Sequence, residues 1–312
     1  MVCLRFFLLL VFGIGLSCLQ AQPGPGLSKD SLEILLKDLR SDARELSELR
    51  ERAAAAFRRL RDRPGDSLSR HYLSQLSLAL VDFPDSTLFH QVNRTAIAAN
   101  RRGRDSLALA NTLWDRAYRM ESESRRDSAF YFYSRARNIL DNLKKRELVA
   151  QLSLRIGTLQ NLLKDYLGAE ANMVAALRQY EATDNQMGLF KAYSSLGMNA
   201  KDQGLYEESF KYYGEARKHL ENLDAEAQDW NVFYNNLGNV YRTSGDQATA
   251  LEYYRSSLED PELRETNPFS FGFYKSNLGK AYFELGRYAE AEAAYREALE
   301  VRDSLGSPAQ LA

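Results

Sequence analysis

Residues 234–261 read YNNLGNVYRTSGDQATALEYYRSSLEDP, and residues 276–300 read SNLGKAYFELGRYAEAEAAYREALE. Both stretches place apolar residues at helical spacing, and in each a second Gly follows the first after seven residues. Gly238 lies inside the first helical pattern, where a glycine costs about 1 kcal/mol relative to alanine. A helix that keeps such a residue needs a compensating reason, and the rest of the chain supplies one.

The stretch is one copy of a repeat, because Gly157, Gly197, Gly238 and Gly279 are 40, 41 and 41 residues apart. Ala117 stands one repeat earlier. A small residue follows twelve positions later in each copy, and a Tyr or Met sixteen positions later; these columns include Ala250 and Ala291, and Tyr254 and Tyr295. We interpret the glycine as the point where a second helix crosses too closely for a Cβ. The small residue then faces it, the aromatic residue meets the next repeat, and Gly245 ends the first helix.

This pattern resembles the tetratricopeptide repeat, a helix-turn-helix unit that stacks into a superhelix. The resemblance covers residues 107–303 and implies an all-α fold, an α-solenoid. It places five repeats at about 107–143, 147–183, 187–223, 228–261 and 268–303. The scarcity of Val and Ile beside Leu, Ala, Glu and Arg also argues against sheets. Repeats longer than the usual 34 residues are similar to the variant in scaffolds that clasp extended peptides and in peptide-sensing regulators.

The first 21 residues have the layout of a secretory signal peptide: Arg5, an apolar run over 6–16, and Ala21. The run is short for a membrane span, so we expect cleavage after Ala21, with lipidation at Cys18 as the alternative. The cysteines, Cys3 and Cys18, both lie in this segment, so the cleaved chain has no thiol. We therefore expect an exported protein, periplasmic or secreted, that does not span the membrane.

Residues 28–62 carry a heptad pattern, with Leu32, Leu39, Leu46, Ala53 and Leu60 spaced by seven. The pattern predicts a coiled-coil-like helix, which either joins two chains in a homodimer or packs on its own protein. Residues 67–101 are expected to form a helical pair of uncertain type. Residues 304–312 are typical of the start of a further repeat, so we expect this chain to be a fragment of something longer.

The sequence shows no pattern typical of catalysis. The three His residues fall in separate predicted helices without a second ligand at metal spacing, and we expect no metal. No glycine-rich phosphate loop is present, and no cofactor is expected. The net charge of -1 offers no general attraction to nucleic acid. We therefore expect neither an enzyme nor a nucleic-acid partner.

The resemblance implies a partner site on the concave face of the superhelix. In proteins similar to this one, first-helix residues three before, one after and four after the glycine line that groove. Carried over, the candidate residues are Met198, Lys201, Asn235, Asn239, Arg242, Ser276 and Lys280. An amide can donate to and accept from a peptide backbone, and the cations would attract an acidic segment. The alternative for Asn239 is a purely structural role.

Two functions follow as hypotheses. The first is a non-enzymatic scaffold that binds a protein or peptide, as an extended segment or a helix, in the concave groove. The second is the extracytoplasmic input region of a membrane signalling protein, such as a sensor histidine kinase or a transcription regulator. An apolar span of about 20 residues beyond Ala312 would select the second.

Overall fold

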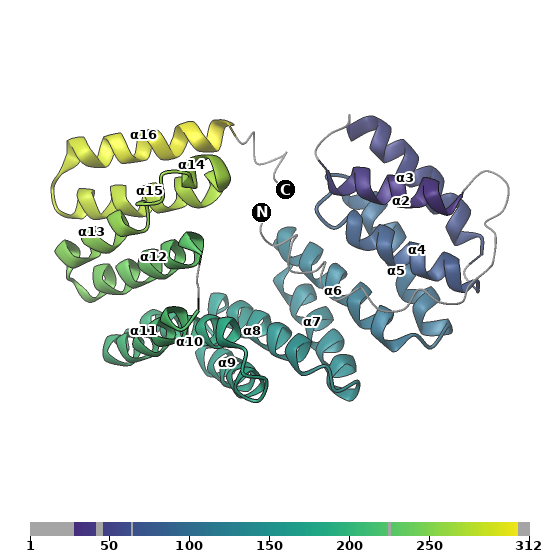
Figure 1. Cartoon of the computed structure of the whole chain (residues 1–312), viewed down its shortest axis with the longest axis horizontal. Helices are drawn as coiled ribbons and strands as arrows, with labels where there is room; N and C mark the ends of the chain where they lie inside the picture. Colours follow the sequence, from purple (N-terminus) through teal and green to yellow (C-terminus); the bar gives the residue numbers. More distant parts are fainter. Residues whose placement is uncertain (1–27, 42–45, 64, 224–225, 305–312) are drawn as a thin grey trace. The chain divides into compact units, whose positions relative to one another are not determined.

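The computed structural model describes residues 28–41, 46–63, 65–223 and 226–304. These residues form fifteen helices and no strand, which confirms the all-α prediction (Figure 1). They fall into two compact units, here called the N-terminal unit (28–148) and the C-terminal unit (149–304). No helix among the described residues is long and apolar enough to cross a bilayer. The expected signal segment, Cys18 and nearly all of 304–312 lie outside the described residues.

Six helices lie wholly in the N-terminal unit: α2 Lys29–Arg40, α3 Leu46–Arg61, α4 Ser67–Ala79, α5 Ser86–Arg102, α6 Ser106–Ser122 and α7 Arg126–Asn142. The first four share one apolar core, centred on side chains such as Leu73 and Phe89, which are fully buried. Asp66, Asp85 and Asp105 each accept a backbone N–H three residues on, so α4, α5 and α6 begin with a side-chain cap.

The heptad stretch is two helices where the sequence predicts one. The backbone takes an extended conformation at Ser41 (φ -110°, ψ 141°), and α3 begins at Leu46. The helices run antiparallel, since Arg52 Nη1 lies 2.9 Å from Asp38 Oδ2. Except for Leu46, which is 57% exposed, the heptad residues are buried in the core of their own unit. The pattern thus serves the intramolecular alternative, and the homodimer alternative is left to a sedimentation test.

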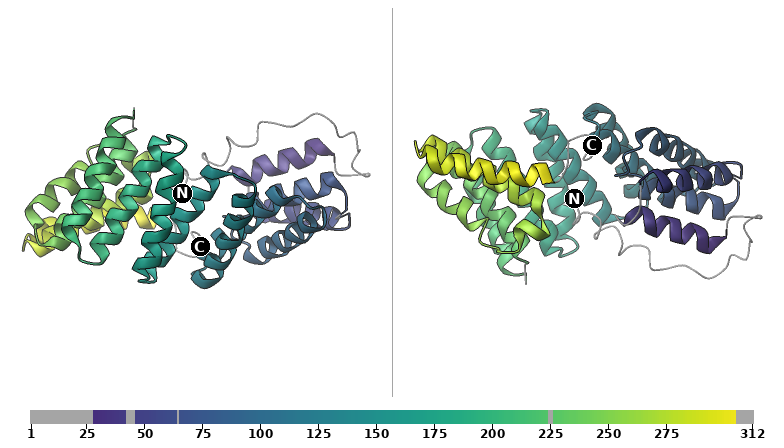
Figure 2. Two further views of the ribbon diagram at one scale, coloured as in Figure 1. Left: turned by 90° about the horizontal axis from the view of Figure 1, so that it is seen from below. Right: turned by 90° about the horizontal axis from the view of Figure 1, so that it is seen from above.

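The C-terminal unit contains α8 Arg146–Leu162 (from Val149 on), α9 Tyr166–Glu181, α10 Gln186–Asp202, α11 Tyr206–Glu221, α12 Ala227–Ser244, α13 Gln247–Ser256, α14 Leu263–Thr266, α15 Pro268–Glu284 and α16 Tyr288–Ser304. In both views of Figure 2 these helices lie alongside one another. The expected repeats coincide with the helix pairs, the first pair being α6 and α7. Helix α13 is short and ends at Ser256, five residues before Pro261.

The repeat glycines make room for an aromatic ring. A Cβ on Gly238 would lie 2.9 Å from the ring of Tyr254, and one on Gly197 would lie 2.7 Å from the ring of Tyr213. At Gly157, where Met173 replaces the tyrosine, the nearest atom is the Ala169 carbonyl oxygen at 2.9 Å. The small column therefore faces the glycine as expected, but the closest neighbour in the other copies is the ring, which corrects our interpretation.

A left-handed residue recurs in the turns. Gly204, Gly245 and Gly286 have φ of 78°, 100° and 72°, which glycine adopts without a Cβ penalty. Non-glycine residues take the same conformation at Arg104, Ser124, Lys144, Lys164 and Asp184. From 104 to 204 these positions are twenty residues apart. Turns within a repeat and turns between repeats therefore have the same backbone conformation here.

Candidate functional site

The first helices of the repeats form one side of the C-terminal unit. Helix α10 contacts α12, and α12 contacts α15. Figure 1 shows α10, α12, α13, α15 and α16 following one another around this unit. We call the exposed arc of α10, α12 and α15 the inner face; it includes the positions six before and one, four and five after the repeat glycine.

The two candidate asparagines are held by their neighbours. Asn235 is 2% exposed, and its Oδ1 accepts from Asn277 Nδ2 of the next repeat at 2.8 Å. Asn239 is half-buried, and its Oδ1 accepts from the Tyr254 hydroxyl at 2.8 Å. Burial raises the pKa of Tyr254 to about 12, which keeps the hydroxyl protonated as the donor. Both amide oxygens thus join helices, and the backbone-pairing role assigned to them stays a prediction.

Two of the three candidate cations are paired along the helices. Lys201 Nζ lies 2.7 Å from Asp202 Oδ1, and Asp202 Oδ2 accepts from Asn161 Nδ2 at 2.6 Å. Arg242 Nη1 lies 3.1 Å from Glu284 Oε1 of the next repeat. These contacts link successive repeats at equivalent positions. They also reduce the positive charge that a ligand would meet there.

Lys280 differs from the other two cations. It is exposed on α15, and among the described residues no carboxylate pairs with it. Met198 is half-buried at the equivalent position of α10, and Ser276 uses its hydroxyl to donate to the Gly272 carbonyl. The structure therefore brings the candidate residues onto one side of the unit, but leaves Lys280 as their most accessible charge.

An aromatic strip surrounds Lys280. Phe269, Phe273 and Phe283 are 62%, 52% and 58% exposed on the same arc of α15. Val232, 36% exposed, occupies the position on α12 equivalent to Phe273. Of the three phenylalanines, only Phe283 stands at a position that the family resemblance puts in the groove, four residues after Gly279. A helical projection of 269–283 could have found the others, since they share an arc with Lys280.

Several buried polar atoms on the first helices have no hydrogen-bond partner among the described residues. Four of them lie on one stripe of α8, α10 and α12: Asn161 Oδ1, Ser194 Oγ, Asn231 Nδ2 and Arg242 Nε. The fifth, Asn199 Oδ1, lies elsewhere on α10. An unpaired buried polar group costs about 1–3 kcal/mol. Groups of this kind are normally satisfied by ordered water or by a ligand. The stripe therefore lies buried beside the inner face, where ordered water can satisfy its polar atoms.

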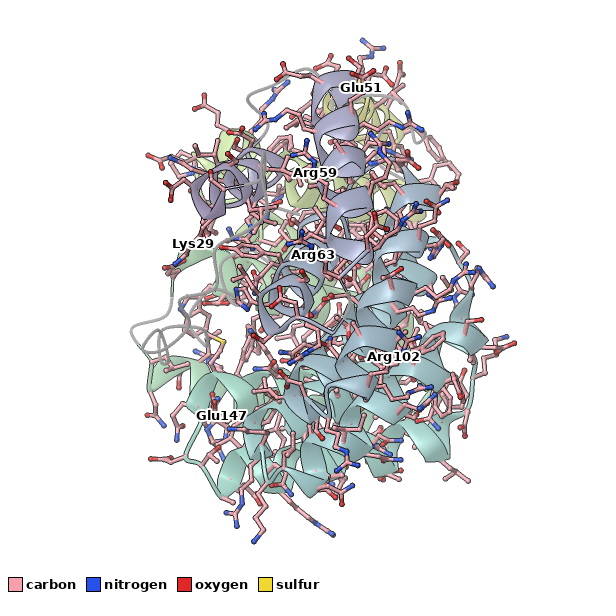
Figure 3. The ribbon with its side chains drawn as sticks, turned by 90° about the vertical axis from the view of Figure 1, so that its right-hand side faces the viewer. Lys29, Glu51, Arg59, Arg63, Arg102 and Glu147 are labelled. Carbon is pink, nitrogen blue, oxygen red and sulfur yellow. The ribbon has the colours of Figure 1, made fainter. Side chains whose placement is uncertain are left out.

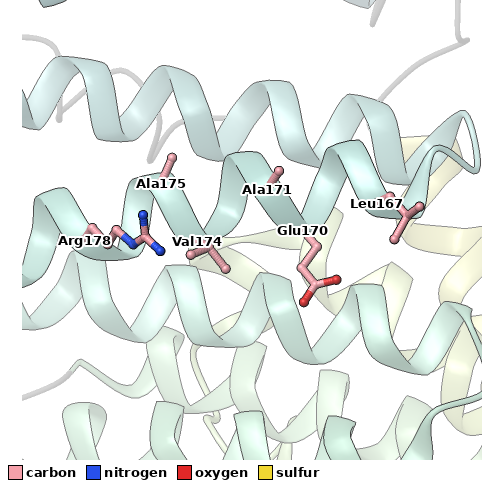
Figure 4. A pocket seen from close by; sticks show the side chains of 6 residues that line it. All are labelled: Leu167, Glu170, Ala171, Val174, Ala175 and Arg178. Carbon is pink, nitrogen blue, oxygen red and sulfur yellow. The ribbon is translucent and has the colours of Figure 1, made fainter.

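Other candidate sites are poorer. A shallow depression on α9 is lined by Leu167, Glu170, Ala171, Val174, Ala175 and Arg178, which all come from one helix (Figure 4). Within the described ranges, no group of three or more His, Cys, Asp or Glu is arranged to hold a metal. His219 stacks on Tyr193 with ring centroids 5.5 Å apart and bonds Gln186 at 2.8 Å, which is a packing role.

Models of a known protein family match part of this chain. Tetratricopeptide-repeat models match residues 189–260 and 274–304. No curated protein matches the sequence.

Solved structures share the fold at low identity. The apo form of RapI is 15% identical with a TM-score of 0.68, over 88% of this chain and 97% of that one. Aspartyl phosphate phosphatase F from Bacillus subtilis is 15% identical with a TM-score of 0.66, over 87% and 69%. NprR in complex with its cognate peptide NprX is 14% identical with a TM-score of 0.59, over 88% and 79%. The matched ranges and the helix pairs identify tetratricopeptide repeats over residues 189–260 and 274–304 of this chain.

Proposed function

We propose that the C-terminal unit binds a segment of a partner protein along its inner face, without catalysis. The observation that carries this proposal is the aromatic strip: three phenylalanines on one helix face expose apolar area that a monomer ordinarily covers. Lys280, within the strip, favours an acidic residue between apolar ones in the bound segment. NprR, which has a similar fold, binds a peptide, and this supports a segment rather than a small molecule as the ligand.

In this proposal affinity comes mainly from the aromatic strip, and Lys280, the most accessible charge beside it, orients the bound segment. We further propose that binding takes place outside the cytoplasm, as the expected signal peptide requires.

Site-specific photo-crosslinking in the native cell tests the site. A photoreactive amino acid at Phe273 should capture a discrete partner, while the same group at Leu299 on α16 should not. Leu299 is a matched control because it is 57% exposed against 52% for Phe273, but lies on a second helix. Lys280→Glu should weaken the capture, and added salt should reduce the difference between the variant and the wild type. Equal capture from both positions would contradict the inner face as the site.

A further inference from the structure

Positive charge gathers at one end of the N-terminal unit. The turns that follow α3, α5 and α7 contain RDR at 61–63, RRGR at 101–104 and KKR at 144–146. Successive helices joined by short turns run antiparallel, so these three turns lie at the same end of the unit. The overall net charge of -1 conceals this, because acidic residues outnumber basic ones in residues 149–312.

Contacts place the first two turns beside each other. Arg70 Nη1 donates to the Gly65 carbonyl at 2.7 Å, in the turn after α3. A Cβ on Gly103 would lie 2.5 Å from Arg70 Nε, so the same guanidinium also lies against the turn after α5. Helices α6 and α7 pack on each other and α5 on α6, which continues the row to the third turn. We call this surface the basic end; its exposed cations are Arg61, Arg63, Arg101, Arg102, Arg104, Lys144, Lys145 and Arg146.

Asp30, Asp141 and Glu147 are exposed acidic residues near these turns, while other acidic groups at this end are engaged in the fold. Asp66 accepts from the backbone N–H and the hydroxyl of Ser69. Asp105 accepts the Ala108 N–H as the cap of α6. Asp62 lies 3.4 Å from Arg61. Among the described residues no carboxylate pairs with three cations of the basic end, which are Arg63, Arg102 and Lys145.

The form of the basic end suits a flat anionic surface. Its cations stand on the tips of successive turns, spaced by the roughly 10 Å between packed helices. Two depressions, the one on α9 and a second between the start of α3 and residues 83–85, are not lined by these cations. Lys29, Arg63 and Arg102 lie on the side of this unit turned to the viewer in Figure 3. Turn tips in a row can touch a plane together, whereas a small anion needs a recess.

We propose that the basic end docks on the anionic phospholipid surface of a membrane. Helix α2 also begins at this end, where Lys29 adds a further exposed cation, so a broad anionic surface can meet the turns together. Each Lys or Arg near an anionic bilayer contributes about 1 kcal/mol, or about fivefold in binding. The proposal is independent of the inner face and assigns the two units different partners.

The test is vesicle sedimentation of the chain from Gln22 onward. At low salt it should bind vesicles of phosphatidylcholine with phosphatidylglycerol and not vesicles of phosphatidylcholine alone. The triple variant Arg63→Gln/Arg102→Gln/Lys145→Gln should lower the partition coefficient at least tenfold. The control Lys37→Gln/Arg125→Gln/Arg126→Gln removes the same charge from exposed positions away from the basic end and should lower it less than threefold. Circular dichroism melts should show both variants folded.

Three results would overturn the proposal. One is no binding of the wild type to anionic vesicles at low salt. Another is an equal loss of binding in the two triple variants, since general charge would then explain it. The third is binding to a short DNA duplex that is as tight as binding to vesicles and equally dependent on the basic end. That outcome would assign the surface to nucleic acid instead.

Discussion

Alanine at two equivalent glycines should have opposite effects on stability. In Gly238→Ala the new methyl group would lie 2.9 Å from the Tyr254 ring, which is 0% exposed and held by its bond to Asn239. In Gly279→Ala the distance is 3.0 Å, but Tyr295 is 41% exposed and its ring can swing outward. The two substitutions are chemically identical and differ in whether the neighbour can move.

The magnitudes follow from two opposing effects. Replacing glycine by alanine inside a helix gains about 1 kcal/mol, while overpacking a rigid core costs about 1–3 kcal/mol. We expect Gly238→Ala to lower the free energy of unfolding by about 1 kcal/mol and Gly279→Ala to raise it by about 0.5–1 kcal/mol. Gly238→Leu should cost more, on the order of 2–4 kcal/mol.

Chemical denaturation of the three variants measures these differences, with thermal melts as a second readout. About 1 kcal/mol corresponds to roughly 2–4 °C in a unit of this size. A double-mutant cycle of Gly238→Ala with Tyr254→Leu should show a coupling of at least about 0.5 kcal/mol, because the smaller side chain removes the clash. Equal stabilisation by both alanines, or no coupling, would refute the account of the glycine as space for the ring.

Three further outcomes are expected. Lys164→Gly should stabilise the chain by about 0.5 kcal/mol, since a non-glycine residue in the left-handed conformation is strained, and Gly204→Lys should destabilise it by about 1 kcal/mol; denaturation midpoints check both. Burial raises the pKa of Asp115 to about 7 from 3.8. Between about pH 4 and pH 7 this carboxyl therefore holds a proton in the folded chain but not in the unfolded chain. The free energy of unfolding should fall as the pH rises through that window. Asp115→Asn should abolish this slope, and unfolding curves at pH 5 and 8 would show it. Sedimentation velocity should find no dimer through residues 28–62 at tens of micromolar; a dimer lost when these residues are deleted would contradict the intramolecular packing.

The repeats could be predicted from the sequence because their columns report contacts within one helix pair. Gly238 and Tyr254 belong to the same repeat, so fixed spacing captures their contact. Asn235 bonds Asn277 in the next repeat, and that contact depends on how neighbouring pairs are placed, which no column records. For this reason Asn235, whose amide was expected to bond a ligand, is found to bond the next repeat instead. We expect Asn235→Ala to lower the free energy of unfolding by about 1 kcal/mol, because it removes the acceptor of the half-buried Asn277 amide.

The aromatic strip and the helix break were harder to predict for other reasons. An apolar residue at helical spacing is ordinarily assigned to the core, and only the neighbouring repeat decides whether Phe273 is covered. The heptad pattern of 28–62 is satisfied equally by one long helix and by two that pack on each other. The polar Asp42 at a seam position was the local sign of a break, and the chain turns extended one residue earlier, at Ser41.

The twenty-residue spacing of the left-handed turns makes the chain modular at its junctions. Lys164 and Gly204 end their helices in the same conformation, so joining residue 164 to residue 205 would remove one helix from each of two pairs. Helix α8 would then be followed by α11 through an unaltered turn. Duplication or loss of such a segment in a gene would create no new type of connection. An array of this kind can change its length in evolution while each junction keeps its geometry.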